Sequence, residues 1–118
     1  MLVLLAPMAT ACASPTRVIA ENQIATARYA IREAVAKDAG SYAPEELQMA
    51  VTKFEAARNA SPDAGIRLAQ QATVMARLAS AVAVRESARA QLAKAVRVQR
   101  QSEKLRTETI EAVEETAR

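Results

Sequence analysis

The sequence predicts an all-α protein: a three-helix antiparallel bundle or helical hairpin module whose long third helix projects beyond it. Roughly a quarter of the residues are Ala, the strongest helix former, while Gly and Pro are scarce. Apolar residues recur at spacings of three and four, which places them on one face of a helix. The β-branched runs bounded by turns that would indicate strands are missing. At 118 residues the chain has room for one domain.

The N-terminal residues resemble the processing site of a bacterial lipoprotein. Cys12, the single cysteine, follows an uncharged apolar run and is followed by Ala13-Ser14-Pro15. Residues 1–11 fit the apolar part of a secretory signal, which is about 7–15 residues long. Such signals begin with Lys or Arg, so we expect an upstream start and an incomplete signal peptide here. The resemblance implies that Cys12 is lipidated; the alternative is a frayed apolar N-terminus with an incidental Cys.

Residues 12–17 are expected to form the lipidated N-terminus and a linker, because Pro15 disfavours helix in the residue before it. A first helix is predicted from about Thr16 or Arg17 to about Ala39. Lys37 in the last turn and Gly40 just beyond it are typical of a helix C-terminus. The predicted buried stripe consists of Ala20, Ile24, Ala27, Ile31 and Ala34/Val35.

A second helix is predicted to begin at Pro44, since Pro suits the first helical position. Glu45 and Glu46 favour the positive end of the helix dipole, and Tyr42 and Leu47 have the spacing of a hydrophobic staple. This helix is expected to end near Asn59 or Ala60. Its predicted buried positions are Leu47, Ala50, Val51, Phe54 and Ala57.

A third helix begins with Ser61 or Asp63 as its cap. No Pro or Gly follows Gly65, so this helix can continue for about fifty residues, or about 75 Å. The shorter first two helices can cover only its first half. We therefore predict a three-helix module over residues 18–86 and a projecting half over residues 87–118. The predicted core positions are Leu68, Ala72, Met75/Ala76, Ala79 and Val82/Ala83.

The projecting half has fewer apolar residues, and one heptad track through it contains polar residues in its middle. That track is Leu92, Val96, Gln99, Glu103, Arg106, Ile110, Val113 and Ala117, which supports a coiled coil only weakly. Basic residues dominate from Arg67 to Arg106, and an acidic tail follows. Two chains paired antiparallel would set the basic part of one beside the acidic part of the other.

The chain lacks the residues that most enzyme sites need. It has no His, so nucleophile–His pairs and His–metal sites are excluded. Two glycines, Gly40 and Gly65, cannot build a phosphate-binding loop. We therefore expect neither an enzyme nor a cofactor or metal. Nucleic-acid binding is disfavoured by the scarcity of aromatic residues for base stacking and by the predicted export.

A basic stripe is predicted on the third helix. Arg85, Arg89, Arg97, Arg100 and Lys104 fall within an arc of about 120° when each residue turns the helix by about 100°. This stripe could contact the phosphates of lipopolysaccharide or the carboxylates of the cell-wall polymer. The alternative is an ordinary solvated helix face.

Several segments resemble the bacterial lipoproteins of domain-of-unknown-function family 4398. They are Cys12-Ala13-Ser14-Pro15, Asp38-Ala39-Gly40, Tyr42-Ala43-Pro44-Glu45-Glu46-Leu47, Ala50, Lys53, Ala56-Ala57 and Leu68-Ala69-Gln70-Gln71-Ala72. The resemblance spans roughly residues 12–80, and the Tyr-Ala-Pro-Glu-x-Leu element is its most specific part. It implies a helical envelope lipoprotein of Gram-negative bacteria, with no catalytic residues.

The sequence thus leads to two hypotheses for a lipid-anchored protein. Ala13 stands where Asp would favour retention at the inner membrane, so lipoproteins in general imply outer-membrane delivery, on the periplasmic side. The preferred hypothesis is a scaffold or adaptor whose projecting helix engages a protein partner or a second copy. The alternative is a binding module for peptidoglycan or lipopolysaccharide through the basic stripe.

Overall fold

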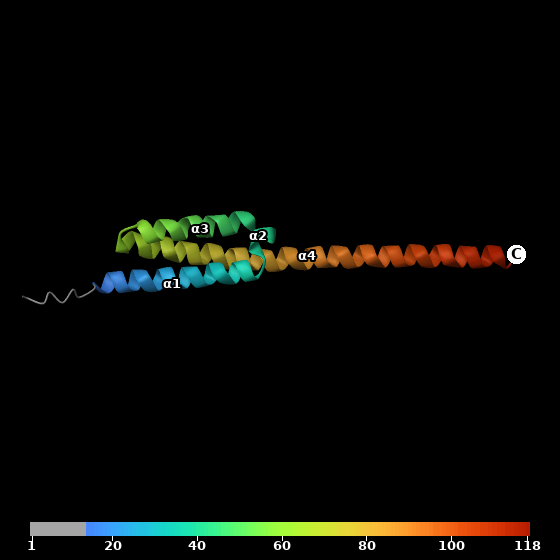
Figure 1. Ribbon diagram of the computed structural model, residues 1–118, viewed down its shortest axis with the longest axis horizontal. Helices are drawn as coiled ribbons and strands as arrows, with labels where there is room; N and C mark the ends of the chain where they lie inside the picture. Colours follow the sequence, from blue (N-terminus) through green and yellow to red (C-terminus); the bar gives the residue numbers. More distant parts are fainter. Residues whose placement is uncertain (1–13) are drawn as a thin grey trace, which may run out of the picture.

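The computed structural model describes residues 14–118, so the predicted signal peptide and Cys12 lie outside the described residues. The all-α prediction is confirmed. The described residues form α1 (Pro15–Ala36), α2 (Ala39–Tyr42), α3 (Pro44–Asn59) and α4 (Pro62–Thr116), and no strand occurs among them. α1 and α4 run in the same direction, and α3 runs antiparallel to both (Figure 1). The helices pack together at one end of the molecule, and α4 alone continues to the other end.

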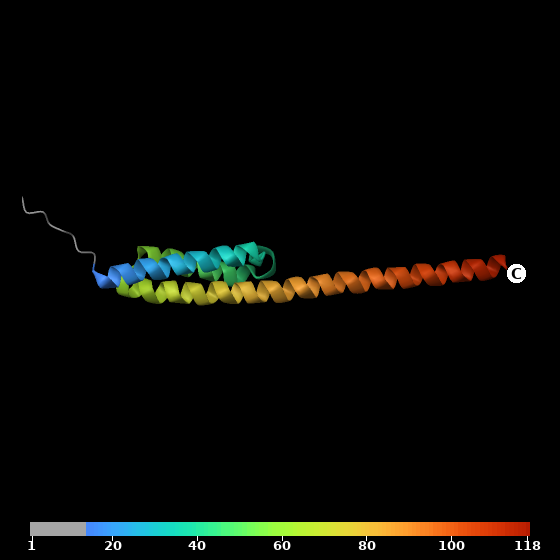
Figure 2. The same ribbon diagram turned by 90° about the horizontal axis from the view of Figure 1, so that it is seen from below.

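α4 is the element that organises the fold. It packs along both α1 and α3, whereas α1 and α3 contact each other much less. At 55 residues it is about 80 Å long, more than twice the length of α1 with its 22 residues. Seen from the second direction, α1, α2 and α3 again cover only the first half of α4 (Figure 2). The start of α1 and the start of α4 lie at the same end, opposite the C-terminus.

The core is built almost entirely of Ala. Ala27, Ala34, Ala50, Ala72 and Ala76 are fully buried, and Phe54 is the only large side chain among the buried residues of the described chain. Small side chains let helix backbones approach closely, so each packed turn buries little side-chain area but gains contacts between backbones. The predicted stripes are correct at every one of their Ala positions, while Val35 is 58% exposed and lies outside the core.

The helix starts agree with local sequence chemistry. Ser14 caps α1 by accepting a hydrogen bond from the backbone N–H of Arg17. Pro44 and Pro62 each occupy the first turn of their helix. Ser61 is the cap of α4, although its side chain makes no capping hydrogen bond. Tyr42 and Leu47 both pack against the core cluster that contains Ala43, as expected for a staple across the α3 start.

The predicted end of the first helix is wrong by three residues. α1 ends at Ala36, Asp38 adopts the left-handed conformation with φ 61°, and Gly40 lies inside the short α2 with an ordinary φ. Asp tolerates this conformation because its short side chain can bond locally, and here its carboxylate accepts a hydrogen bond from the Ser41 hydroxyl at 3.0 Å. Asp38 therefore takes the position just beyond the helix C-terminus that the sequence predicted for Gly40.

Candidate interaction surface on the projecting helix

The half of α4 beyond the core is exposed over its whole length. Ala83 is the last buried residue, and from Ala88 to Arg118 every residue is exposed. The reason is that α1 and α3 do not reach this part of α4, and the sequence agrees: the core-facing positions Ala76 and Ala83 are followed, at seven-residue steps, by Ala90, Arg97 and Lys104. A long charged side chain at these positions prevents the close Ala-mediated approach. We call residues 88–118 the projecting segment.

The five residues of the predicted basic stripe lie on this exposed stretch or just before it, and their local partners differ. Arg85 and Arg89 both contact the same carboxylate, that of Glu86, at 3.2 and 3.0 Å. The Lys104 ammonium is 3.9 Å from a carboxylate oxygen of Glu108. The basic groups and Glu108 are mostly exposed and the Glu86 side chain keeps about a third of its surface, 34%, in contact with water, so such pairs are weak, within about 1 kcal/mol. Arg97 and Arg100 have no ion-pair partner within residues 14–118.

Three residues of the stripe are brought together around one shallow hollow. Arg89, Arg97 and Arg100 surround a space of about 420 Å³ whose floor is formed by Leu92, Ala93 and Val96. Arg85 and Lys104 do not line it. The hollow combines guanidinium groups with an apolar floor, an arrangement that suits an amphipathic or anionic partner lying along the helix.

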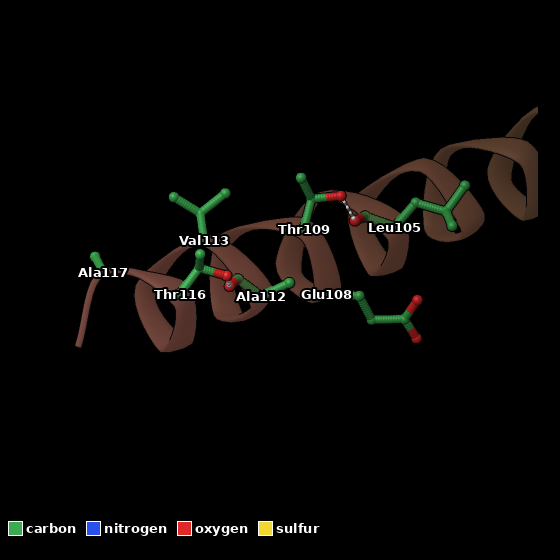
Figure 3. Close-up of a pocket in the computed structure, with 7 residues that line it drawn as sticks. All are labelled: Leu105, Glu108, Thr109, Ala112, Val113, Thr116 and Ala117. Carbon is green, nitrogen blue, oxygen red and sulfur yellow. Dashed lines mark hydrogen bonds between the residues drawn. The ribbon is translucent and has the colours of Figure 1, made fainter.

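A second hollow lies near the end of α4, between exposed residues of the acidic part. It has a volume of about 620 Å³ and is lined by Leu105, Glu108, Thr109, Ala112, Val113, Thr116 and Ala117 (Figure 3). The hydroxyls of Thr109 and Thr116 donate to the backbone carbonyls of Leu105 and Ala112, each at 2.8 Å. With its hydroxyl engaged by the helix, each threonine offers its methyl group to a partner.

On this helix the sequence predicted the charged residues and also Leu92 and Val96, which form part of the floor of the first hollow. It did not single out Ala93, Thr109, Ala112 or Thr116. The signal that could have found them is the absence of charge along a face, since the track that was followed, through Glu103 and Arg106, is interrupted by charges. Cys12 lies outside the described residues, so its lipidation stays a prediction.

Other chemistry is sparse over the described part of the chain. No group of His, Cys, Asp and Glu side chains between Ser14 and Arg118 is placed to hold a metal ion. None of the helices described is long and apolar enough to cross a bilayer. One side-chain hydrogen bond between the long helices occurs within residues 14–118: the Lys53 ammonium on α3 donates to the Gln71 side-chain oxygen on α4 at 2.9 Å.

These observations define an elongated helical protein with a small Ala-based core and a solvent-exposed helical extension. The chain belongs to the family described as domain of unknown function (DUF4398), whose model matches residues 22–95. The match covers the core and the first turns of the projecting segment. No curated protein and no solved structure matches the chain.

Proposed function

We propose that this protein is a non-catalytic envelope lipoprotein, a helical scaffold or adaptor held at the periplasmic face of the outer membrane through a lipid on Cys12. The observation that carries the role is the projecting segment itself, which leaves Leu92, Val98 and Leu105 at 55–65% exposure on a helix that no other element covers. The projecting segment buries no side chains within a single copy of the chain. Its apolar side chains can leave water, and so contribute favourable free energy, only by contacting a partner.

The arrangement of the helices supports an anchor at the N-terminal end. α1 begins at the end of the molecule opposite the C-terminus (Figure 1), and its cap, Ser14, is two residues after Cys12 in the sequence. In this proposal α1, α3 and the first half of α4 form a three-helix antiparallel module next to the membrane. Lipid on Cys12 would keep this end in place, and several acyl chains would make that residence stable.

Mass spectrometry of the mature protein tests the anchor. We expect cleavage before Cys12 and a mass increase that corresponds to acyl chains on this residue. A Cys12→Ser chain is the control, and it should be released from the membrane fraction. An unmodified thiol at Cys12, with residues 1–11 still attached, would refute the proposed location.

Crosslinking in intact cells tests the scaffold role. A photoreactive residue in place of Val98, on the projecting segment, should give a discrete crosslinked species, while one in place of Glu55, exposed on α3, should not. The Glu55 position controls for general crowding at the membrane. Equal crosslinking from both positions, or none from Val98, would contradict the proposal that the projecting segment is the interaction element.

The hollow between Arg89, Arg97 and Arg100 supports a second candidate function, the binding of an anionic envelope polymer. The three arginines present guanidinium groups that pair well with phosphate or carboxylate. Replacement of all three by Glu should abolish retention of the protein by cell wall or lipopolysaccharide. Replacement of Arg17, Arg32 and Arg67 by Glu, outside the hollow, changes the net charge equally and serves as the control. If retention falls equally in both variants, binding depends on net charge alone and the hollow is not a specific binding site.

A further inference from the structure

The projecting helix carries an uncharged face with a strict heptad spacing. Alternating steps of four and three residues from Val84 reach ten successive positions without charge: Val84, Ala88, Gln91, Ala95, Val98, Ser102, Leu105, Thr109, Ala112 and Thr116. Over the same stretch, 14 of the 35 residues from 84 to 118 are charged. All ten residues are exposed. We call these ten residues the heptad face; the C-terminal hollow in Figure 3 is its last part.

We propose that the heptad face pairs with the same face of a second copy of this chain, in an antiparallel coiled coil. This inference rests on the proposed role of the projecting segment as the interaction element, and it does not depend on the lipid anchor. We infer a second copy as the partner because an antiparallel copy would place acidic residues beside the basic residues that flank the face, and basic residues beside the acidic ones.

The charges that argue for this partner lie along one edge of the face. Ser87, Lys94, Gln101, Glu108 and Glu115 occur at seven-residue intervals, one residue before the successive small positions of the face. In an antiparallel pair this edge lies beside the same edge of the other helix, running in reverse. Centred on Gln101, the register places Lys94 opposite the partner's Glu108 on both sides of the centre. Charges at such flanking positions set partner and direction in coiled coils.

The other edge of the face is compatible with the same register. Its residues are Arg85, Leu92, Gln99, Arg106 and Val113. Antiparallel pairing sets Gln99 opposite the partner's Gln99, Leu92 opposite the partner's Arg106, and Arg85 opposite the partner's Val113. No like charges meet, and the arginine stems cover apolar neighbours while their guanidinium groups reach water.

Side-chain volumes in the middle of the face also fit this register, while Ala88 lies opposite the partner's Ala112 nearer its ends. The larger residues Val98 and Leu105 lie opposite the partner's Ser102 and Ala95, so each large side chain meets a small one. Even filling of this kind is what close packing requires. A parallel pair would instead set Leu105 against Leu105 and Ala95 against Ala95, and Lys94 would face Gln99 without any ion pair. Charge and volume thus both favour the antiparallel direction.

The size of the interface is sufficient for a specific dimer. The ten residues of the heptad face and the ten on its two edges amount to 20 residues from each copy. Specific interfaces of standard size use about 20–30 residues a side. The Ala-based cores would lie at opposite ends of the dimer, because residue 84 of each chain then lies beside residue 116 of the other. Two copies anchored in one membrane would accordingly hold the paired helices along its surface.

Single-cysteine crosslinking of the purified chain in a Cys12→Ser background tests the direction. Gln101→Cys lies at the centre of the proposed register, so a short thiol-specific crosslinker should link two copies. Arg100→Cys is the matched control, at the same height but on the opposite side of the helix. Ala112→Cys reports on a parallel pair, because only that arrangement brings two copies of residue 112 together. Dimers from Ala112→Cys, or none from Gln101→Cys, would overturn the proposal.

Charge exchange tests the register independently. By sedimentation at low salt, Lys94→Glu or Glu108→Lys should each raise the dimer dissociation constant about tenfold, since two ion pairs become repulsions. The double variant K94E/E108K should restore the original affinity. Failure of the double variant to recover would refute the register. If Val98 captures a different protein in cells while the purified chain stays monomeric at high concentration, this inference falls and the scaffold proposal stands.

Discussion

The guanidinium carbon of Arg28 on α1 lies 5.8 Å from the ring centroid of Phe54 on α3, so a cation–π contact joins two helices that otherwise touch little. Arg58, on α3 itself, approaches the same ring at the same distance. Phe54 is 8% exposed and packs in the cluster that contains Ala27, Ala57, Ala69 and Ala72. One aromatic side chain therefore connects the three long helices in a core whose other buried apolar side chains are Ala.

Phe54→Ala is expected to lower the free energy of unfolding by about 3–5 kcal/mol, because removal of the ring leaves a cavity that small neighbours cannot fill. Phe54→Leu should cost clearly less. Arg28→Ala should cost about 0.5–1 kcal/mol, and this cost should disappear in the Phe54→Leu background. Denaturant titration followed by circular dichroism gives the free energy of unfolding of the three single variants and of the double variant Arg28→Ala/Phe54→Leu. An equal loss from Arg28→Ala in both backgrounds would show that the ring is not its partner.

Ala76→Leu is expected to destabilise the protein by about 1–3 kcal/mol or more. Ala76 is fully buried on α4 in a cluster with Ala30 on α1 and Ala50 on α3, so three added carbons would separate backbones in close approach. Ala90→Leu makes the same chemical change at an exposed position of the same helix and should change stability by less than about 0.5 kcal/mol. If the two variants have the same free energy of unfolding, the close packing of the helices through Ala is refuted.

The two glycines should respond differently to substitution by Ala. A Cβ at Gly65 would lie 3.1 Å from the Ala57 carbonyl oxygen, where α3 and α4 approach each other, while a Cβ at Gly40 would meet nothing within 4 Å. Gly40→Ala should gain about 0.4–1 kcal/mol, since Ala reduces the entropy of the unfolded chain. Gly65→Ala should gain nothing, and Gly65→Val should be destabilising. Thermal unfolding compares them, and an equal gain at both glycines would contradict the crowding at Gly65.

Asp38→Ala should cost about 1–2 kcal/mol, because Ala at φ 61° suffers the steric cost of the left-handed region and the bond from Ser41 is lost. Asp38→Asn keeps a short polar side chain and should be nearly neutral. Asp38→Gly relieves the backbone strain but removes the hydrogen bond, so it should fall between them. Melting temperatures should decrease in the order Asp38→Asn, Asp38→Gly, Asp38→Ala. If Asp38→Ala were the most stable of the three, the role of the left-handed conformation at this residue would be refuted.

A chain that ends after Arg89 should keep the melting temperature of the core within a few degrees at low protein concentration. All buried residues lie before this position, with Ala83 the last. The same chain should lose self-association, which sedimentation measures. A large fall in the melting temperature at a concentration where the complete chain is monomeric would mean that the projecting segment supports the core within one copy.

The sequence predicted the helices well because their determinants are local. Pro44, Pro62 and Ser14 act on the turn in which they stand, and the absence of Pro and Gly after Gly65 permits one long helix. The end of the first helix was predicted at about Ala39, with Gly40 just beyond it, because Gly is the usual residue after a helix C-terminus. The helix ends at Ala36 instead, and Asp38, supported by Ser41, takes the left-handed conformation.

The candidate surface was only half predictable. The positions of Arg89, Arg97 and Arg100 on one side of a helix follow from helix geometry, and the structure brings them around one hollow. Leu92 and Val96 of the apolar floor were also predicted, as part of one heptad track. The heptad face was not predicted, because most of its positions are Ala, Ser, Thr or Gln, which give almost no hydrophobic signal. Their significance depends on exposure, and exposure is decided by which other helices are long enough to reach them.

By itself, the sequence determined an all-helical chain with Ala-rich faces and a long last helix, because helix propensity, caps and seven-residue spacing act over short distances. The end of burial at Ala83 also follows the sequence, which predicted Val82/Ala83 as the last core position. Only the tertiary structure decided that Phe54 connects three helices and that Asp38 takes the left-handed conformation after α1. These depend on the relative lengths and directions of segments far apart in the chain, and no local pattern specifies them.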